Sequence, residues 1–462
     1  MSMTRVNKSD RPSLISLSTE VLCQILLHLD DPSILAARQT NRTLYFASKS
    51  RHLWCQIINR LQMSHGVPAP EDEIDAYTVE ELEKWGFRRN RAQALWAGIS
   101  KNRFRTRIVN LPDCPINSSC YCKLIPGVRW LLVGYSNATM YIIDLEDVSL
   151  TSHLLCDPGE FYKKLCETGN ITYNFWVNPS KSRLSLRIAG CVTESFSDAR
   201  TFVYQVDLVG HGSAATLIAR PYAYFPNCDD GEGPAAAGQL QVYDYYAKVV
   251  EGGEDQPMSS DSNPIICNLS GSFFNAINFV HDDTFVVLGT SPDAVYVLEI
   301  NPITRSITLL HTIIIETSSD CDLWWSDIVG FPGSSESRMV FLGYNPTFLR
   351  GIVIPHHKNI PATKVEFAEV QSDWNRTPNL TALGPSVSLF FQSDWLQDVG
   401  LFRIFGQSWD ISHPNQLADY FSVDYESMNG GFELASFDQN IGRVAYIVYD
   451  GSTARISVVD LV

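Results

Sequence analysis

The chain has 462 residues, 45% of them hydrophobic and 11% aromatic, which is enough for about two to four domains with well-packed cores. Its formal net charge of −16 argues against nucleic acid as a partner, and without a run of about eighteen apolar residues the sequence predicts no membrane-spanning helix. Eleven cysteines without a disulfide-like spacing are typical of reduced thiols, so we expect a cytoplasmic or nuclear protein.

A first helical region is predicted over residues 14–62, after a polar tail at residues 1–13 that lacks the apolar segment of a signal peptide. Ser18 is the expected cap of the first helix. Four apolar residues then follow the spacing of one helix face: Leu22, Ile25, Leu26 and Leu29.

Three more helices are expected in the same region. Asp31 can cap the second, with Pro32 at its first helical position, and Asn41 can cap the third. Ser50 can start the fourth. The fourth helix would carry its apolar residues on one side: Leu53, Trp54, Ile57, Ile58 and Leu61.

These residues resemble an F-box, whose pattern runs Leu-Pro-x-Glu, Ile-Leu-x-x-Leu, Asp-Pro and Leu-Trp. The corresponding segments here are Leu17 to Glu20, Ile25 to Leu29, Asp31-Pro32 and Leu53-Trp54. Two positions depart from the family. Ser18 replaces the usual proline, and Thr40-Asn41 stand where a Val-Cys pair is common, which places a polar pair near the expected partner.

The resemblance implies that the region binds a Skp-type adaptor protein and, through it, a cullin. The positions that match the apolar pattern of the family are Leu17, Ile25, Leu26, Leu29, Leu35 and Trp54. A helical unit this small hides only about 60% of its unfolded surface, so at least one apolar stripe must meet a partner or the next domain. The alternative is a helical cap that packs only on the rest of its own chain.

A helical linker is expected over residues 63–104. Thr78 and Glu81 have the spacing of a capping box, and that helix should stop near Gly86, with a further helical segment from Ala92. The basic run at residues 88–91 fits a nuclear-localisation signal or an acid-binding patch, but also a solvated helix face turned towards the acidic part of the chain.

From residue 105 to 462 the helical periodicity gives way to short β-rich runs bounded by turn residues. Several of these runs end alike, for example at Asp144, Asp207, Glu299 and Asp460, and the endings recur about every 50 residues. This texture resembles a degenerate WD-repeat β-propeller without the Gly-His and Trp-Asp signatures of the family. We expect seven blades, with six or eight as alternatives.

Residues 105–109 are expected to close the ring against the last blade, around residues 445–462. Two polar insertions, at residues 226–238 and 251–264, are predicted to be loops. The fold class expected for the whole chain is therefore multidomain: a small α-helical F-box and helical linker, followed by an all-β propeller.

The motifs that could carry catalysis are weak. The segment from Gly210 to Ala215 has the Gly-x-Gly-x-x-Ala spacing of a dinucleotide site, but Pro221 follows where such a site needs a helix, so a hairpin turn is expected. Cys114, Cys120 and Cys122 lack a second pair with zinc-like spacing. We therefore expect no enzyme activity, no cofactor and no metal.

The function that follows is recognition of a client protein for a Skp-cullin-F-box ubiquitin ligase. The propeller would hold the client, and the excess of acidic residues in 111–462 (40 against 19 basic ones) favours a basic client. The alternative is a protein-interaction scaffold that carries an F-box but serves no ligase.

Overall fold

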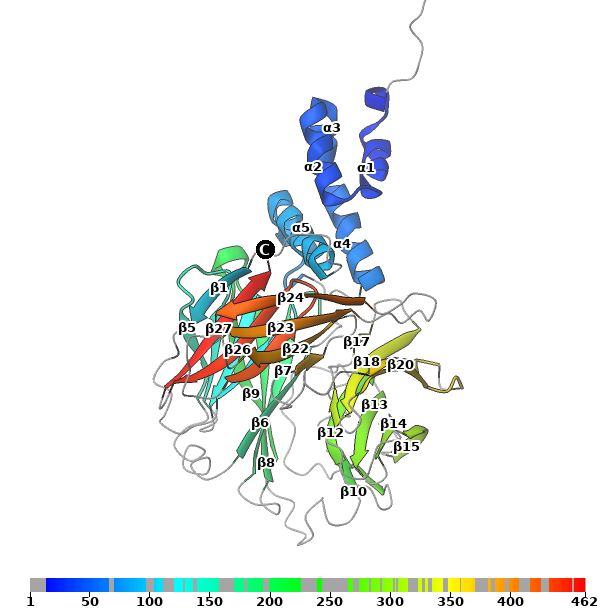
Figure 1. Cartoon of the computed structure of the whole chain (residues 1–462), viewed down its shortest axis with the longest axis vertical. Helices are drawn as coiled ribbons and strands as arrows, with labels where there is room; N and C mark the ends of the chain where they lie inside the picture. Colours follow the sequence, from blue (N-terminus) through cyan, green and yellow to red (C-terminus); the bar gives the residue numbers. More distant parts are fainter. Residues whose placement is uncertain are drawn as a thin grey trace, which may run out of the picture.

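The computed structural model shows a helical unit standing on one side of a larger β body (Figure 1). The residues that the structure describes are 14–65, 70–96, 104–109, 111, 120–127, 129–135, 139–157, 170–177, 181–193, 199–225, 239–242, 265–268, 274–281, 284–290, 293–301, 304, 306–314, 323–325, 329–330, 335–343, 348–357, 359–369, 381–383, 387–394, 399–406, 416–424, 432–450 and 453–461. The predicted tail at 1–13 and both polar insertions lie largely or wholly outside these ranges.

The helical region divides into short elements: η1 (Leu14–Ser16), α1 (Thr19–Leu27), α2 (Asp31–Thr40), α3 (Arg42–Ser48), α4 (Arg51–His65), η2 (Ile74–Ala76) and α5 (Val79–Trp96). Asn41 caps α3 as predicted, because its side chain accepts a hydrogen bond from the Thr43 N–H at 2.7 Å. The cap of α2 lies one residue earlier than predicted. Asp30, and not Asp31, accepts the hydrogen bond from the Ser33 N–H, at 3.0 Å.

Ser18 is the N-cap residue of α1, as predicted, but it does not cap the helix through its side chain. Ser18 has the extended backbone of an N-cap residue, but its side chain accepts no capping hydrogen bond. Hydrogen bonds from the Glu20 N–H and the Ser18 hydroxyl instead hold the pKa of the exposed Glu20 carboxylate below its usual range. The Ser18 hydroxyl is thus used by a neighbouring side chain.

The linker contains one long helix where two were expected. The predicted capping box is confirmed: the Thr78 N–H donates to Glu81 Oε2 at 2.7 Å, and the Glu81 N–H donates to Thr78 Oγ at 3.2 Å. The predicted stop near Gly86 was wrong, since α5 runs through this residue to Trp96. Burial of Gly86 against α4 offsets its low helix propensity.

Antiparallel sheets make up the β body. In chain order the strands are β2 (Cys120–Leu124), β3 (Trp130–Tyr135), β4 (Met140–Asp144), β5 (Ser152–Cys156); β6 (Asn170–Val177), β7 (Ser185–Thr193), β8 (Ala199–Val209), β9 (Thr216–Phe225); β10 (Gln239–Val242), β11 (Ile265–Asn268); β12 (Phe274–His281), β13 (Thr284–Thr290), β14 (Asp293–Asn301), β15 (Ser306–Ile314); β16 (Leu323–Trp325), β17 (Val329–Gly330), β18 (Glu336–Gly343), β19 (Phe348–Pro355), β20 (Thr363–Glu369); β21 (Thr381–Leu383), β22 (Val387–Asp394), β23 (Val399–Gly406), β24 (Gln416–Asp424); β25 (Phe432–Asp438), β26 (Arg443–Asp450) and β27 (Thr453–Leu461). Each semicolon separates two sheets, within which consecutive strands pair, except that β16 and β17 both pair with β18.

The remaining strand, β1 (Phe104–Val109), closes the body as predicted. It pairs antiparallel with β27, from Phe104 opposite Leu461 to Val109 opposite Ile456, so the first and last strands share one sheet in the order β1-β27-β26-β25 (Figure 1). Sequential antiparallel meanders closed by the first strand are the topology of a β-propeller. The expected seven blades remain a prediction.

A bulge recurs where the third strand of a sheet pairs with the fourth. The extra residue is on the fourth strand, opposite Met140 and Tyr141 in the first sheet, and the equivalent positions in four other sheets are Val203/Tyr204, Val297/Leu298, Leu349/Arg350 and Arg403/Ile404. A bulge twists the outer strand away from a flat edge, which discourages pairing with another molecule. This shared irregularity marks these sheets as repeats of one unit.

The glycine-rich segment that follows β8 is a hairpin connection, as predicted. It holds the short helix η3 (Gly212–Ala214) between the paired strands β8 and β9. Gly210 has a φ of +79°, and a Cβ there would stand 2.6 Å from the Ala214 carbonyl oxygen. Glycine is therefore required for this turn.

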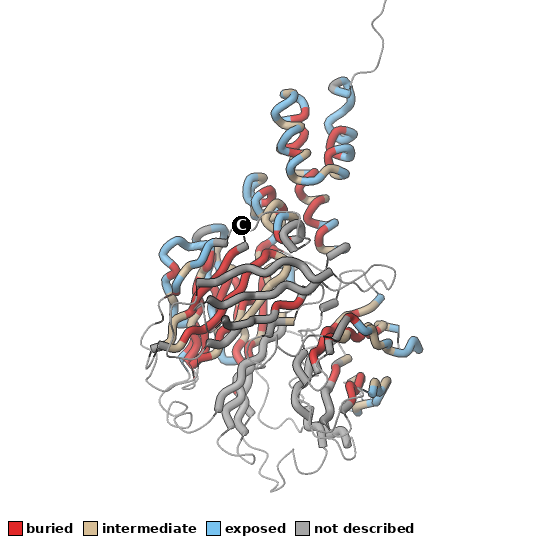
Figure 2. The backbone as a smooth tube through the Cα atoms, viewed as in Figure 1, coloured by how far each residue is buried: buried red, intermediate tan, exposed pale blue. Residues whose placement is uncertain are grey.

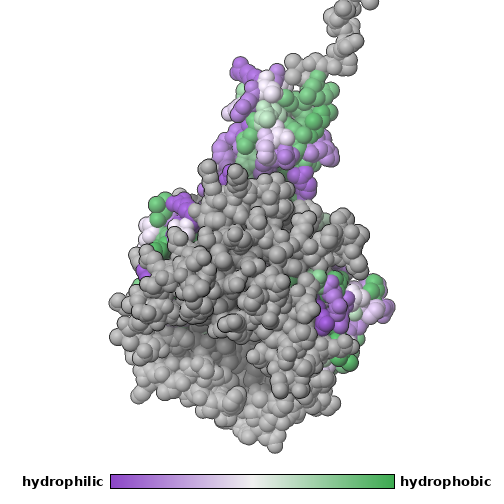
Figure 3. Space-filling model, in the orientation of Figure 1, coloured by the Kyte–Doolittle hydropathy of each residue, from purple (hydrophilic) through white to green (hydrophobic). Residues whose placement is uncertain are grey.

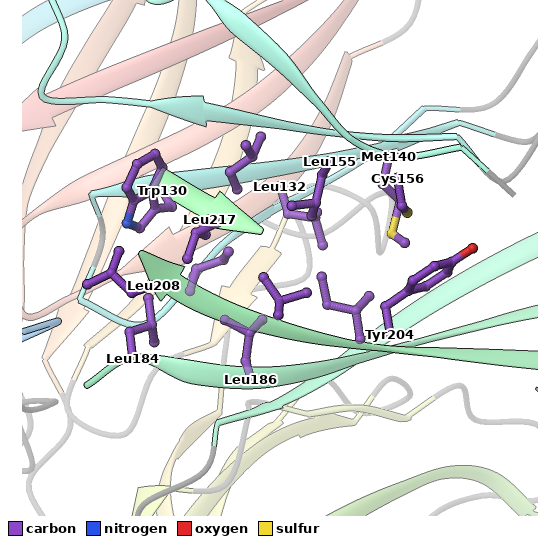
Figure 4. Packing of buried hydrophobic residues seen from close by; sticks show 14 of the residues in the cluster. Trp130, Leu132, Met140, Leu155, Cys156, Leu184, Leu186, Tyr204, Leu208 and Leu217 are labelled. Atoms are coloured by element: carbon purple, nitrogen blue, oxygen red, sulfur yellow. The ribbon is translucent and has the colours of Figure 1, made fainter. Parts of the chain in front are cut away.

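Neighbouring sheets pack face to face through large apolar side chains. In Figure 4, Trp130, Leu132 and Met140 from one sheet face Leu186, Tyr204 and Leu208 from the next. The buried residues form continuous bands through the sheets, while in the helical unit they face inwards (Figure 2). Among the described residues, no helix is long and apolar enough to cross a membrane.

Candidate protein-docking surface

The residues of the helical unit fill its own hydrophobic core. Leu22, Leu26, Leu53 and Trp54 are each no more than 1% exposed and form one cluster with the apolar side of α4. The Trp54 Nε1–H donates to the Ser48 carbonyl oxygen at 2.9 Å. The unit therefore does not need a partner to complete its core.

A second set of apolar side chains is left on the outside. Leu17 is 36% exposed, Ile25 36% and Leu35 42%, and all three were predicted to bind the adaptor. Figure 3 shows hydrophobic residues gathered on the side of the helical unit where α1 lies in Figure 1. An exposed apolar face of this kind is typical of a protein-docking surface.

The other three predicted site residues have different positions. Leu26 and Trp54 are buried inside the helical unit, and Leu29 is partly buried against the same core. Leu26 and Trp54 therefore shape the unit from within and are not placed to touch a partner, which corrects the expectation that they bind the adaptor directly. The apolar pattern of the family combines core and surface positions, and sequence alone does not separate them.

Sequence reasoning missed two exposed apolar residues beside this set. Leu14 in η1 is 49% exposed and Val21 in α1 is 44% exposed. Val21 and Ile25 have i, i+4 spacing, which places them on the same face of α1. That spacing could have identified Val21. We call Leu14, Leu17, Val21, Ile25 and Leu35 the apolar docking face.

Ion pairs fix the F-box-like helices to the linker helix. Glu83 of α5 accepts from Arg38 of α2 at 2.5 Å and from Lys49, the C-cap of α3, at 2.7 Å. Burial acts against the Glu83 carboxylate, but these two cations outweigh it and hold its pKa below the usual range. At the start of α2, Asp31 accepts from Asn90 of α5 at 2.8 Å.

Arg88 and Arg89 of the basic run are turned towards the acidic β body, as one of the two interpretations predicted, but Arg89 is buried and not solvated. Arg88 forms ion pairs with Glu146 and, at 3.2 Å, with Asp460. Arg89 is buried, stacks over Trp85 at 3.5 Å and donates to the Gly127 carbonyl oxygen at 3.2 Å. Both arginines therefore connect the linker helix to the β body.

The acidic segment before η2 forms a strap across two sheets. The Glu71 carbonyl oxygen accepts from the Leu184 N–H at 2.6 Å, and Asp72 is paired with Arg183 at 2.8 Å and with His211 Nδ1 at 2.6 Å. Burial raises the pKa of Glu71 to about 7, although the guanidinium groups of Arg89 and Arg129 oppose the shift. The strap and α5 together hold the helical unit on the β body.

The described part of the chain contains no candidate metal centre. No group of three or more His, Cys, Asp or Glu side chains is placed there to hold a metal ion. Cys120 and Cys122 are buried in the core of the β body, and Cys114 lies outside the described residues. Burial is the ordinary state of a structural cysteine.

Comparison with protein families places the docking face within a known domain. The F-box domain model matches residues 14–56, slightly less than the predicted 14–62. Residues 14–56 form an F-box domain. F-box domains generally bind Skp-type adaptor proteins.

No curated protein matches the chain. Among solved structures, Raptor of Chaetomium thermophilum is 12% identical, with a TM-score of 0.43 over 96% of this chain and 42% of Raptor, so the F-box protein spans less than half of that relative. The WD40 domain of SCAP from fission yeast is 10% identical, with a TM-score of 0.35 over 74% of this chain and 81% of that domain. The β-propeller domain of Cps50 (Swd1) from Myceliophteria thermophila is 11% identical, with a TM-score of 0.33 over 73% and 81% of the two chains.

Proposed function

We propose that this F-box protein recognises a client protein for a Skp-cullin-F-box ubiquitin ligase. The observation that carries the proposal is the apolar docking face of the F-box, which stays exposed although the core beneath it is complete. A helix that packs one apolar side into its own core and exposes another to solvent is suited to bind in the groove of a partner. The partner implied by the F-box is a Skp-type adaptor, and through it a cullin.

The linker supports a role in which the distance between the F-box and the propeller is fixed. The strap and α5 make hydrogen bonds or ion pairs to both the F-box and the β body, including Glu83 with Arg38 and Arg89 with Gly127. A client held on the propeller would therefore stay at a set distance from the bound adaptor. Fixing two reactants in place raises their effective concentration without any chemistry by the holder.

The client is proposed to bind the propeller, which acts as a rigid scaffold for recognition by loops. The acidic excess of residues 111–462, 40 acidic against 19 basic residues, favours a client with a basic segment. The chain itself is proposed to have no enzyme activity and to act in the cytoplasm or the nucleus, with no nucleic acid, membrane or cofactor involved.

Affinity purification from eukaryotic cells with the proteasome blocked tests the proposal. The wild-type chain should recover a Skp-type adaptor, a cullin and a ubiquitinated client. The double variant Leu17→Asp, Ile25→Asp should lose the adaptor and the cullin, because it places charges in an apolar interface. Val148→Asp is the matched control, since Val148 is an 89% exposed apolar residue outside the F-box.

The outcomes separate ligase from scaffold. Recovery of the adaptor without a cullin would indicate an F-box scaffold outside a ligase. Failure of the wild-type chain to recover any adaptor would refute the proposed function. If the double variant recovers the adaptor at the wild-type level, the apolar docking face is not the surface that binds the adaptor.

A further inference from the structure

Asp460, near the end of β27, lies where three arginines from three different elements meet. Arg443 Nε of β26 donates to Asp460 Oδ1 at 2.5 Å, and Arg107 Nη2 of β1 donates to Oδ2 at 2.6 Å. Arg88 Nη2 of α5 donates to Oδ1 at 3.2 Å. One carboxylate thus joins both strands that flank β27 to the linker helix.

The charges around Asp460 mean that replacing it with a neutral residue would destabilise the cluster. The Arg443 side chain is 1% exposed, and those of Arg107 and Asp460 are each 13% exposed. Glu146 is the second carboxylate of the cluster, paired with Arg88 and 3.6 Å from Arg443 Nη2. If Asp460 loses its charge, three guanidinium groups remain with one carboxylate in a region that water screens poorly.

The direction of α5 depends on this cluster because the described contacts attach α5 and its approach to three different sheets of the β body. The strap holds the approach to α5 on the sheet of β6–β9 through Asp72 and Arg183, and Arg89 holds the helix on the sheet of β2–β5 through Gly127. Two attachments leave an axis about which a rigid helix can turn. Arg88 supplies a further attachment, to the closing sheet of β25, β26, β27 and β1.

We propose that Asp460 is a positioning residue that couples closure of the propeller to the direction of α5 and of the F-box. The same carboxylate fixes Arg107 of the closing strand β1 and Arg88 of α5, and β1 directly follows α5 in the chain. When β27 and β1 pair, α5 acquires its third attachment. The use of this direction, to hold a client at a set distance from an adaptor, rests on the proposed function.

The test measures the F-box direction in the full chain without any partner. Spin labels are attached through unnatural amino acids at two exposed positions, Gln39 on α2 and Arg220 on β9, and the distance distribution between them is recorded. The wild-type chain should give one narrow distribution. Arg88→Ala should broaden it while the unfolding temperature of the β body stays unchanged, because Arg107 and Arg443 keep their carboxylate.

Three further variants sharpen the test. Asp460→Asn should broaden the distribution and also lower the unfolding temperature, and Arg88→Lys should restore part of the narrow distribution. Lys84→Ala is the matched control: Lys84 is an exposed cation of α5 that lies 3.6 Å from Glu146 and forms no pair with Asp460. It should leave the distribution narrow.

A distribution for Arg88→Ala as narrow as that of the wild type would overturn the proposal, whether or not Asp460→Asn folds. Equal broadening by Lys84→Ala would also overturn it, because Glu146 would then be the anchor. Neither result bears on adaptor binding. If the wild-type chain binds no adaptor but Arg88→Ala still broadens the distribution, only the proposed function would be refuted.

Discussion

The indole of Trp54 lies directly against Gly86: a Cβ built on Gly86 would stand 3.2 Å from Trp54 Cζ3 and 3.3 Å from Cε3. Trp54 is fully buried, and its ring meets Phe87 of α5 edge-on at 4.9 Å between centroids. Helices α4 and α5 therefore approach each other through a notch that only glycine leaves open. This contact joins the F-box core to the linker helix.

Gly86→Ala is expected to destabilise the helical unit. Alanine gains about 1 kcal/mol in helix propensity, but overpacking a buried side chain costs about 1–3 kcal/mol, and Trp54 is held by its hydrogen bond to Ser48. Urea unfolding should show a net loss of about 1 kcal/mol. In a Trp54→Phe background, where the smaller ring leaves space, the same change should stabilise. A gain from Gly86→Ala in the wild-type background would contradict the packing described here.

Thr78→Ala should weaken the start of α5. It removes the hydroxyl that accepts from the Glu81 N–H, and a lost N-cap costs about 1 kcal/mol. Thr78→Ser keeps the hydroxyl and is the control. Equilibrium unfolding of the three proteins measures the effect, and equal stability of the alanine and serine variants would show that the cap is unimportant.

Local signals in the sequence predicted most elements of the helical unit and the closing strand. The Asn41 cap, the Thr78–Glu81 capping box and the buried side of α4 depend on residues a few positions apart, which sequence spacing shows directly. The pairing of β1 with β27 was found because the ring needs closure. The contacts that depend on distant residues escaped prediction.

The stop predicted at Gly86 shows why. Whether a glycine ends a helix depends on what packs against it, and Trp54 lies 32 positions earlier in the chain. The meeting of Arg88 with Asp460, 372 positions apart, had no local signal at all. The division of the F-box residues into core and docking face required the packing, since Leu26 and Ile25 are adjacent and differ only in the side they face.

Stability should fall as the pH rises from about 5 to about 8 because of Glu71. Burial raises its pKa in the folded state to about 7, so the folded chain keeps a proton that the unfolded chain, with the ordinary value of 4.5, has lost. A raised carboxyl pKa stabilises the fold at the acidic end of this window, here by about 2–3 kcal/mol, and the gain is gone above the folded pKa.

Urea unfolding of the wild-type chain and of Glu71→Gln at both pH values isolates this contribution. The free energy of unfolding of the wild type, taken relative to that of the variant, should fall by about 2–3 kcal/mol as the pH rises. The raised pKa of Asp31, to about 6, acts in the same direction but is present in both proteins. A difference that is constant with pH would show that Glu71 does not take up a proton on folding.

Removal of β27 should open the propeller. A chain that ends at Asp450 loses the strand that pairs with both β26 and β1, which exposes two strand edges and leaves Arg443 and Arg107 without Asp460. The shortened chain is expected to aggregate when expressed. A soluble product with a single cooperative unfolding transition would contradict closure by this strand.

Calorimetric titration of a purified Skp-type adaptor into the full chain tests the docking face most directly. Saturable binding with one adaptor per chain is expected for the wild type and for Val148→Asp. The double variant Leu17→Asp, Ile25→Asp should bind at least about 100-fold more weakly, since truncating or charging interface anchors costs several kcal/mol. No binding by the wild type, or equal affinity of the double variant, would contradict the assignment of Leu17 and Ile25 to an adaptor-binding surface.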